Sequence, residues 1–151
     1  MGGAVRLRYV LTSFLILVAD RLSKILVMQH MAEGESIPIL APVLYLTYVR
    51  NTGAAFGLLR GKAPVLAGIA VLGVALAAWQ WKRIVSQGSR VKWGLAAALA
   101  GALGNMIDRL AYGSVIDFFD IRIWPIFNIA DLAISCGIVL LFWEVLSHDQ
   151  R

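Results

Sequence analysis

The chain has 151 residues, a formal net charge of +5, 60% hydrophobic residues and 15% charged residues. This length favours a single domain over residues 1–151, and the composition excludes an ordinary soluble domain. Basic residues flank apolar stretches instead of forming a stripe with aromatic residues, so we expect no nucleic-acid partner. The single cysteine, Cys136, excludes an internal disulfide and a cysteine metal site.

Four apolar stretches approach the length of a membrane-spanning helix, which is about 17–25 residues. They cover residues 9–28, 63–81, 93–107 and 126–143. The first stretch follows basic residues, but no small-residue cleavage site follows it, so we interpret it as a retained helix and not as a removed signal sequence. We therefore predict a mainly α-helical integral membrane protein with four transmembrane helices.

The distribution of basic residues predicts the orientation of these helices. Arg6 and Arg8 precede the first span. The link between the second and third spans holds four more basic residues, Lys82, Arg83, Arg90 and Lys92. Both termini and this link are therefore expected in the cytoplasm. The other two connections, residues 29–62 and 108–125, are expected on the opposite side.

Each of these two outer connections contains a segment with the character of a β-strand. Residues 42–49 are rich in β-branched and aromatic residues, and turn residues follow at 51–53. Residues 114–123 have similar character, and Pro125 then suits the first turn of the last helix. Extended backbone cannot face lipid unpaired, so we predict a small extracytoplasmic β element in which the two segments pair or pack on protein.

Polar residues inside two of the spans share single helix faces. Asp20 and Lys24 are four residues apart, which predicts an ion pair along the first helix. One face of the third span carries small and polar residues, namely Gly94, Ala98, Gly101, Asn105, Asp108 and Arg109. Its glycines favour close packing against another helix.

Two carboxylates stand among apolar neighbours in the second half of the chain. Asp131 lies near the start of the fourth span, on one face with Asn128 and Ser135, and Asp117 lies within the strand-like segment. Two such carboxyls within reach of each other cannot both ionise comfortably, so one keeps its proton. An acid beside a base can activate water against a peptide bond without a metal or another cofactor.

Two functions other than peptide cleavage remain open for a chain with these residues. A proton-coupled transporter or a proton-relay membrane subunit would use membrane carboxylates to pass protons. A noncatalytic membrane assembly factor would tolerate asparagine at either aspartate. Cleavage of a peptide distinguishes an aspartic peptidase from the transporter or relay subunit and from the assembly factor.

Five segments in order resemble one family. They are Asp20–Lys24 (DRLSK), Asn51–Phe56 (NTGAAF), Gly104–Arg109 (GNMIDR), Val115–Phe118 (VIDF) and Phe127–Asp131 (FNIAD). Together they resemble the bacterial lipoprotein signal peptidase family, signal peptidase II, over the whole chain. The resemblance implies an aspartic endopeptidase of the bacterial cytoplasmic (inner) membrane, with both termini in the cytoplasm and the active site near the extracytoplasmic face.

The resemblance also implies roles for individual residues. Asp117 and Asp131 are the expected catalytic pair. The expected substrate-binding residues are Asn51, Gly53, Asn105, Arg109 and Asn128. The expected supporting residues are Asp20, Lys24, Gly104 and Asp108.

The expected substrate is a prolipoprotein with a diacylglyceryl-modified cysteine, cut on the amino side of that cysteine. Membrane lipids are the other expected partner, and we expect a monomer. The strand at residues 42–49 is expected to form a platform at the membrane surface. The stretch after Gly53 is expected to close over the bound substrate.

Overall fold

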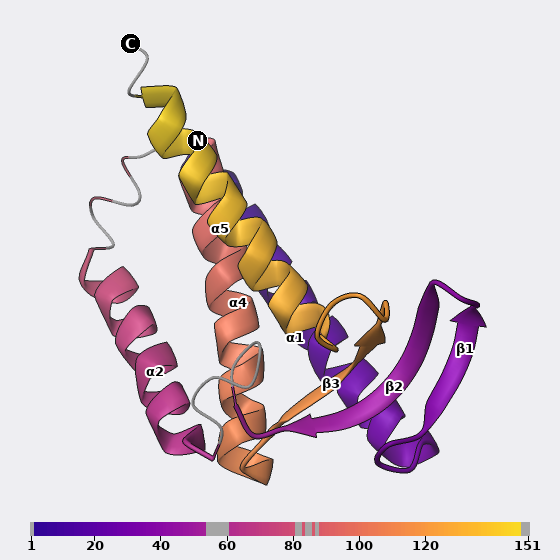
Figure 1. Ribbon diagram of the computed structural model, residues 1–151. Helices are drawn as coiled ribbons and strands as arrows, with labels where there is room; N and C mark the ends of the chain where they lie inside the picture. Colours follow the sequence, from indigo (N-terminus) through magenta and orange to yellow (C-terminus); the bar gives the residue numbers. More distant parts are fainter. Residues whose placement is uncertain (1, 54–60, 81–82, 84–85, 87, 149–151) are drawn as a thin grey trace.

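The computed structural model describes residues 2–53, 61–80, 83, 86 and 88–148. Its helices are α1 (Gly2–His30), α2 (Ala63–Trp79), α4 (Ser89–Tyr112) and α5 (Ile129–His148). Its strands are β1 (Ser36–Leu40), β2 (Leu44–Asn51) and β3 (Val115–Asp120). Figure 1 shows α1, α4 and α5 packed as a bundle, with α2 beside α4 and the sheet at one end. The start of α1 and the end of α5 both lie at the other end.

Each of the four predicted spans lies mainly on a helix. The second span, predicted to end at residue 81, ends at Trp79, and the fourth, predicted from residue 126, begins at Ile129; residue 81 lies outside the described residues. The first span, residues 9–28, lies within α1, and the third, residues 93–107, lies within α4. The predicted place of Pro125 in the first turn of the last helix is wrong, because α5 begins at Ile129. Asn128 caps this helix, which leaves Pro125 three residues before the cap.

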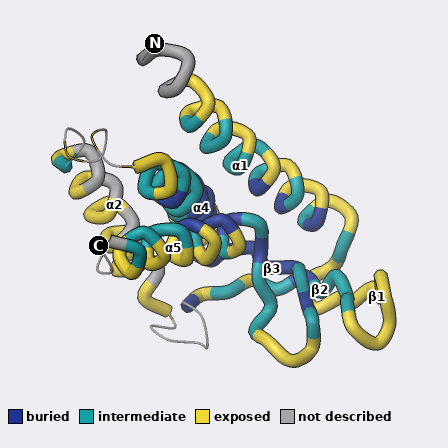
Figure 2. Tube along the Cα trace, turned by 90° about the horizontal axis from the view of Figure 1, so that it is seen from above, coloured by how far each residue is buried: buried dark blue, intermediate teal, exposed yellow. Residues whose placement is uncertain are grey.

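Three charged residues of α1 and α4 are buried within the bundle. Asp20 and Lys24 on α1 and Asp108 on α4 are fully buried, whereas Leu11 and Phe14 on α1 are exposed. Figure 2 shows the same division along α1, with an exposed outer side. By length and mean hydropathy alone, one helix among the described residues qualifies as a membrane span, at Ile129–Ser147. The buried polar residues lower the apolar character of α1 and α4.

The sheet has the order β1-β2-β3, and both pairs of strands are antiparallel. The two strands expected from sequence are confirmed, and they pair with Val49 opposite Asp117. The sequence analysis missed β1. All five residues of this edge strand are exposed, so it shows no alternation of apolar and polar side chains, and Pro38 interrupts it.

A small apolar core joins the sheet to α1. It contains Val27 of α1, Tyr48 of β2, and Ile116 and Phe118 of β3, all of them buried. Side chains of a strand alternate between its two faces. Ile116 and Phe118 therefore pack on this core, and Asp117 between them points to the opposite face, toward α4 and α5.

Glycines bring α4 and α5 into close contact, as the small face of α4 predicted. A Cβ atom at Gly101 would lie 2.3 Å from the backbone oxygen of Ala130. A Cβ atom at Gly94 would lie 2.8 Å from the backbone oxygen of Gly137, and one at Gly137 would lie 2.5 Å from that of Gly94. The two backbones therefore touch where no side chain intervenes, as is common between membrane helices.

Substitution of Gly101 by alanine is expected to force the first turn of α5 away from α4. The clash is with backbone, which cannot rotate aside, so we expect a loss of about 1–3 kcal/mol of stability. Thermal unfolding in detergent measures it. Gly68→Ala on α2 is the matched control, because nothing lies within 4 Å of its added Cβ. Equal unfolding midpoints for the two variants would contradict the close packing.

Candidate active site

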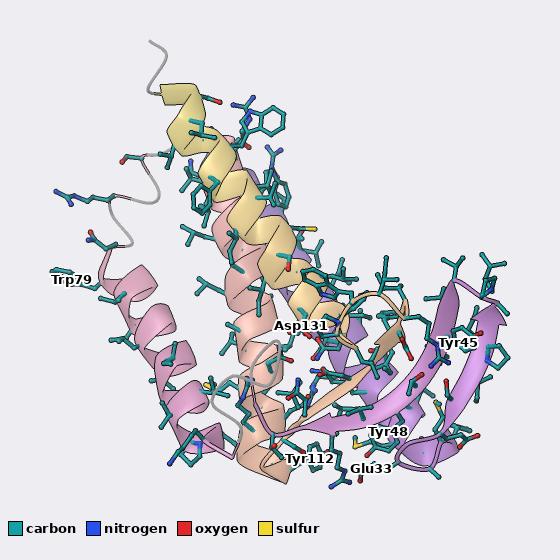
Figure 3. The ribbon with its side chains drawn as sticks, viewed as in Figure 1. Glu33, Tyr45, Tyr48, Trp79, Tyr112 and Asp131 are labelled. Atoms are coloured by element: carbon teal, nitrogen blue, oxygen red, sulfur yellow. The ribbon has the colours of Figure 1, made fainter. Side chains whose placement is uncertain are left out.

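The residues expected to form a site converge where the start of α5 meets the sheet. Figure 3 shows Asp131 at this junction. Asp117 comes from β3, Asn51 from the end of β2, and Asn128 precedes α5. The other residues expected in the site come from α1 (Asp20 and Lys24), from α4 (Gly104, Asn105, Asp108 and Arg109) and from the turn after β2 (Gly53). The hydrogen bonds below connect all of these elements.

Asn128 and Asp131 form a reciprocal cap at the start of α5. The backbone N–H of Asp131 donates to Asn128 Oδ1 at 2.9 Å, and the backbone N–H of Asn128 donates to Asp131 Oδ2 at 3.2 Å. This is the hydrogen-bond pattern of a capping box, with asparagine and aspartate in the two positions. The spacing of the Asn-Ile-Ala-Asp motif is therefore the spacing that starts the helix.

Asn128 also reaches the second carboxylate. Its Nδ2 donates to Asp117 Oδ1 at 2.7 Å, and Asn51 Nδ2 donates to Asp117 Oδ2 at 2.9 Å. One fully buried residue thus contacts both aspartates. Asp117 and Asp131 are therefore both bonded to Asn128.

Asn105 links Asp131 to α1. Its Nδ2 donates to Asp131 Oδ1 at 2.8 Å, and its Oδ1 accepts from Lys24 Nζ at 2.9 Å and from Asn128 Nδ2 at 3.1 Å. An ammonium group can only donate, so the oxygen of the Asn105 amide must face Lys24. Its NH2 group is therefore turned toward Asp131.

The same argument orients the other two amides. The backbone N–H of Gly53 donates to Asn51 Oδ1 at 2.9 Å, so the NH2 of Asn51 faces Asp117. The backbone N–H of Asp131 fixes the oxygen of Asn128 in the same way. Each asparagine is held by a donor on one side and donates to a carboxylate on the other.

A buried cluster of charges lies behind Asn105. Lys24 Nζ is 3.0 Å from Asp20 Oδ2 and 2.8 Å from Asp108 Oδ2, which confirms the predicted pairing of Asp20 with Lys24. Asp108 also accepts from the backbone N–H of Ile116 at 3.2 Å and from Arg21. Asp108 is therefore committed to this cluster and stands apart from the carboxylate pair.

Arg21 is a member of the cluster that the sequence analysis did not single out. It contacts both Asp108 and Asp20, the latter at 3.3 Å. Its position inside the Asp20–Lys24 motif could have indicated this role. Neighbouring positions on a helix usually face different directions, but the arginine side chain is long enough to reach the carboxylates that Lys24 contacts.

Asp20 connects the cluster to the helix that carries Asp131. Its Oδ1 accepts from the backbone N–H of Ala130 at 3.1 Å, so α1 supplies a second cap to α5. A Cβ atom at Gly104 would lie 2.5 Å from Asp20 Oδ2. The absence of a side chain at Gly104 therefore makes room for the Asp20 carboxylate.

Arg109 lies at the edge of the site, next to the turn after β2. Its Nη2 donates to the backbone oxygen of Gly53 at 3.2 Å, and its Nη1 donates to that of Asn105 at 3.5 Å. It lies within electrostatic range of Asp131 and Asp117. It therefore holds the turn at Gly53 against α4 and adds positive charge near the pair.

The surroundings of Asp117 favour its protonated form. Burial is the largest cause, the charge of Asp131 adds to it, and together they raise the pKa of Asp117 to about 7. The hydrogen bonds from Asn51 and Asn128 and the charge of Lys24 act in the opposite direction but are outweighed. Asp117 can therefore hold a proton near neutral pH, as a general acid must.

The family model and the curated relatives that match this chain point to the same family. The family described as Signal peptidase (SPase) II matches residues 12–147. The lipoprotein signal peptidase of Moorella thermoacetica is 42% identical over 138 residues, which cover 91% of this chain and 92% of the relative. That of Syntrophomonas wolfei is 45% identical over 138 residues, which cover 91% of each.

Solved structures agree with this comparison. A bacterial membrane enzyme determined by the in meso method at 2.3 Å resolution is similar with a TM-score of 0.86 and 29% identity, over 93% of this chain and 88% of that one. A second, at 1.9 Å resolution, has a TM-score of 0.82 and 29% identity, over 92% of each chain. This chain belongs to the signal peptidase II family and is a membrane peptidase of lipoprotein processing.

Proposed function

We propose that this chain is an intramembrane aspartic endopeptidase with Asp117 and Asp131 as its catalytic pair. It removes the signal peptide from diacylglyceryl-modified prolipoproteins and cuts on the amino side of the lipid-modified cysteine. The observation that carries this proposal is the contact of both carboxylates with Asn128 at the sheet end of the bundle. The names of the relatives support the substrate class.

The pair begins the reaction with one proton between its two members. The ionised carboxylate takes a proton from water, whose oxygen bonds to the carbon of the scissile peptide, while the protonated carboxyl gives its proton to the carbonyl oxygen. The tetrahedral diol then collapses and the C–N bond breaks. The nitrogen receives the proton taken from water, and one hydroxyl returns its proton to the other carboxyl, which restores the pair.

Four helices span the membrane in this proposal, with both termini in the cytoplasm and the site near the extracytoplasmic face. Three features support it: the exposed apolar surfaces of α1, α2 and α5, the common end at which α1 starts and α5 finishes, and the basic residues between α2 and α4. The protein acts as a monomer surrounded by lipid. The lipid-modified substrate enters the site laterally from the membrane.

Asn51, Gly53 and Arg109 are the proposed substrate contacts nearest the rim of the site. Asn51 and Arg109 are only partly buried. Asn105 and Asn128 were predicted beside them, but both are buried and their amides bond to the carboxylates, so we assign both to positioning the pair. The segment proposed to close over the substrate, residues 54–60, lies outside the described residues.

The experiment that tests this function is cleavage of a purified diacylglyceryl-modified prolipoprotein in detergent, with the products identified by mass spectrometry. A new amino terminus at the lipid-modified cysteine supports the proposal. The same precursor without its lipid is the matched control and is expected to be cut far more slowly. If the lipidated precursor stays intact with folded enzyme, the proposal fails and the proton-relay alternative takes its place.

Activity is expected to decline as the pH rises through about 7, the pKa of Asp117. A raised carboxyl pKa means that the acid form is present below that pH and is lost above it. The pair then carries two negative charges and has no proton to give, so kcat/KM falls by about tenfold per pH unit. Cleavage rates measured at subsaturating substrate across this range test it, and a constant rate well above pH 7 would contradict it.

A further inference from the structure

The two aspartates of the pair make different kinds of contact, although each accepts two hydrogen bonds. Both acceptor bonds to Asp117 come from side-chain amides, those of Asn128 and Asn51. Asp131 accepts one bond from a side-chain amide, that of Asn105, and one from the backbone N–H of Asn128. The difference gives the two carboxylates unequal support for a negative charge.

Asp131 stands in the first turn of α5, where the unpaired N–H groups of the helix carry partial positive charge. Its capping-box bond to Asn128 uses one of those groups. Asp117 lies in β3, and strands have only small net dipoles. The helix terminus therefore stabilises an anion at Asp131 and offers nothing comparable to Asp117.

The buried ammonium group acts on the same residue. Lys24 donates to Asn105 Oδ1 at 2.9 Å, and Asn105 donates to Asp131 at 2.8 Å. A cation bonded to the amide oxygen polarises the amide and strengthens the bond that its NH2 donates. The amides bonded to Asp117 lack such support: the oxygens of Asn51 and Asn128 accept from neutral backbone groups.

The charges near the pair favour one negative charge on it. The ionisable groups on the neighbouring helices are the cluster of Asp20, Arg21 and Lys24 on α1 with Asp108 on α4, and Arg109 at the edge of the site, while β2 contributes the neutral Asn51. These three cations and two anions leave one positive charge in excess. A pair that holds a single proton neutralises it, and an unbalanced charge in this setting would be costly.

We propose that the capping box of α5 and the contact from Lys24 through Asn105 make Asp131 the charged member of the pair and leave the shared proton on Asp117. The catalytic roles that follow from this assignment rest on the proposed function. Asp131 is then the base that takes the proton of water, and Asp117 is the acid that protonates the carbonyl oxygen. As the C–N bond breaks, Asp131 gives its proton to the leaving nitrogen and Asp117 recovers one from the diol.

The resting protein tests this assignment without any substrate. Native protein labelled with [4-13C]aspartate is titrated in micelles, and the two carboxyl signals are assigned by their loss in Asp117→Asn and Asp131→Asn. We expect the Asp131 signal to move in the lower titration step and the Asp117 signal in the upper one. The reverse order, or equal movement of both signals in each step, would overturn the proposal.

Two variants give a matched second measurement. Asn105→Ser removes a donor from the charged carboxylate, so it is expected to raise the lower midpoint by about one pH unit. Asn51→Ser removes a donor that matters only once Asp117 ionises, so it is expected to raise the upper midpoint. Exchanged effects would place the proton on Asp131.

Neither titration depends on cleavage. A chain that titrates in the expected order but cuts no prolipoprotein would refute the proposed function and leave the proton assignment standing. A chain that cuts the substrate but titrates in the reverse order would do the opposite. If Asn105→Ser does not fold, the titration of the native protein still decides the assignment.

Discussion

Asp117→Asn and Asp131→Asn are each expected to lower kcat/KM for prolipoprotein cleavage by about 10⁴-fold or more, since each removes one half of a general acid–base pair. Asparagine keeps the size of the side chain but cannot exchange a proton with water or the diol. The two losses are expected to be non-additive, because the pair acts as one unit. Cleavage rates of the single and double variants measure this.

The matched control is Asp120→Asn, a second buried aspartate on the same strand. Its carboxylate accepts from Thr47 Oγ1 at 2.8 Å and lies 3.3 Å from Arg122 Nη1. Because these contacts lie outside the pair, this variant is expected to cleave at nearly the native rate. An unfolding measurement on each variant separates lost chemistry from lost structure. Substantial cleavage by either variant of the pair would refute the catalytic assignment.

Lys24→Met is expected to destabilise the protein by about 3–5 kcal/mol, the usual effect of removing one partner from a buried ion pair. Methionine matches the lysine stem in length, so packing changes little. The variant leaves Asp20 and Asp108 without the ammonium group that lies 3.0 Å and 2.8 Å from them, inside a bundle where both are fully buried. The unfolding midpoint in detergent measures the loss.

Arg50→Met is the control for charge removal in general. Arg50 and Glu33 are 3.7 Å apart, and both side chains are well exposed, so their pairing contributes little. The expected change in the unfolding midpoint is small. If the Lys24 and Arg50 variants were equally stable, the buried cluster would not be the support of α1, α4 and α5 that its contacts indicate.

The helices and the pairing of charges along one helix could be predicted from the sequence because both depend on local periodicity. Long apolar stretches predicted helices at the observed places, and the four-residue spacing of Asp20 and Lys24 predicted their contact. The family's motifs also named the residues that the structure brings together around Asp117 and Asp131.

The hydrogen-bond partners of the asparagines could not be predicted in the same way. The family resemblance implied that Asn105 and Asn128 lie around the substrate, but it did not name the residues that they contact. Their contacts with Lys24, Asp117 and Asp131 depend on how three helices and a strand meet, which no short segment records. The strand β1 was not predicted for a different reason. An exposed edge strand has no buried face, so its sequence need not alternate between apolar and polar residues.

The fixed orientation of the amides also limits where protons can travel. A proton wire needs groups that accept a proton on one side and release one on the other, as hydroxyls and water do. The NH2 groups of Asn51, Asn105 and Asn128 only donate toward the carboxylates and do not give their protons up. Among the described residues, the contact from Lys24 through Asn105 to Asp131 therefore passes no proton, although proton transport between the cluster and the pair would require one.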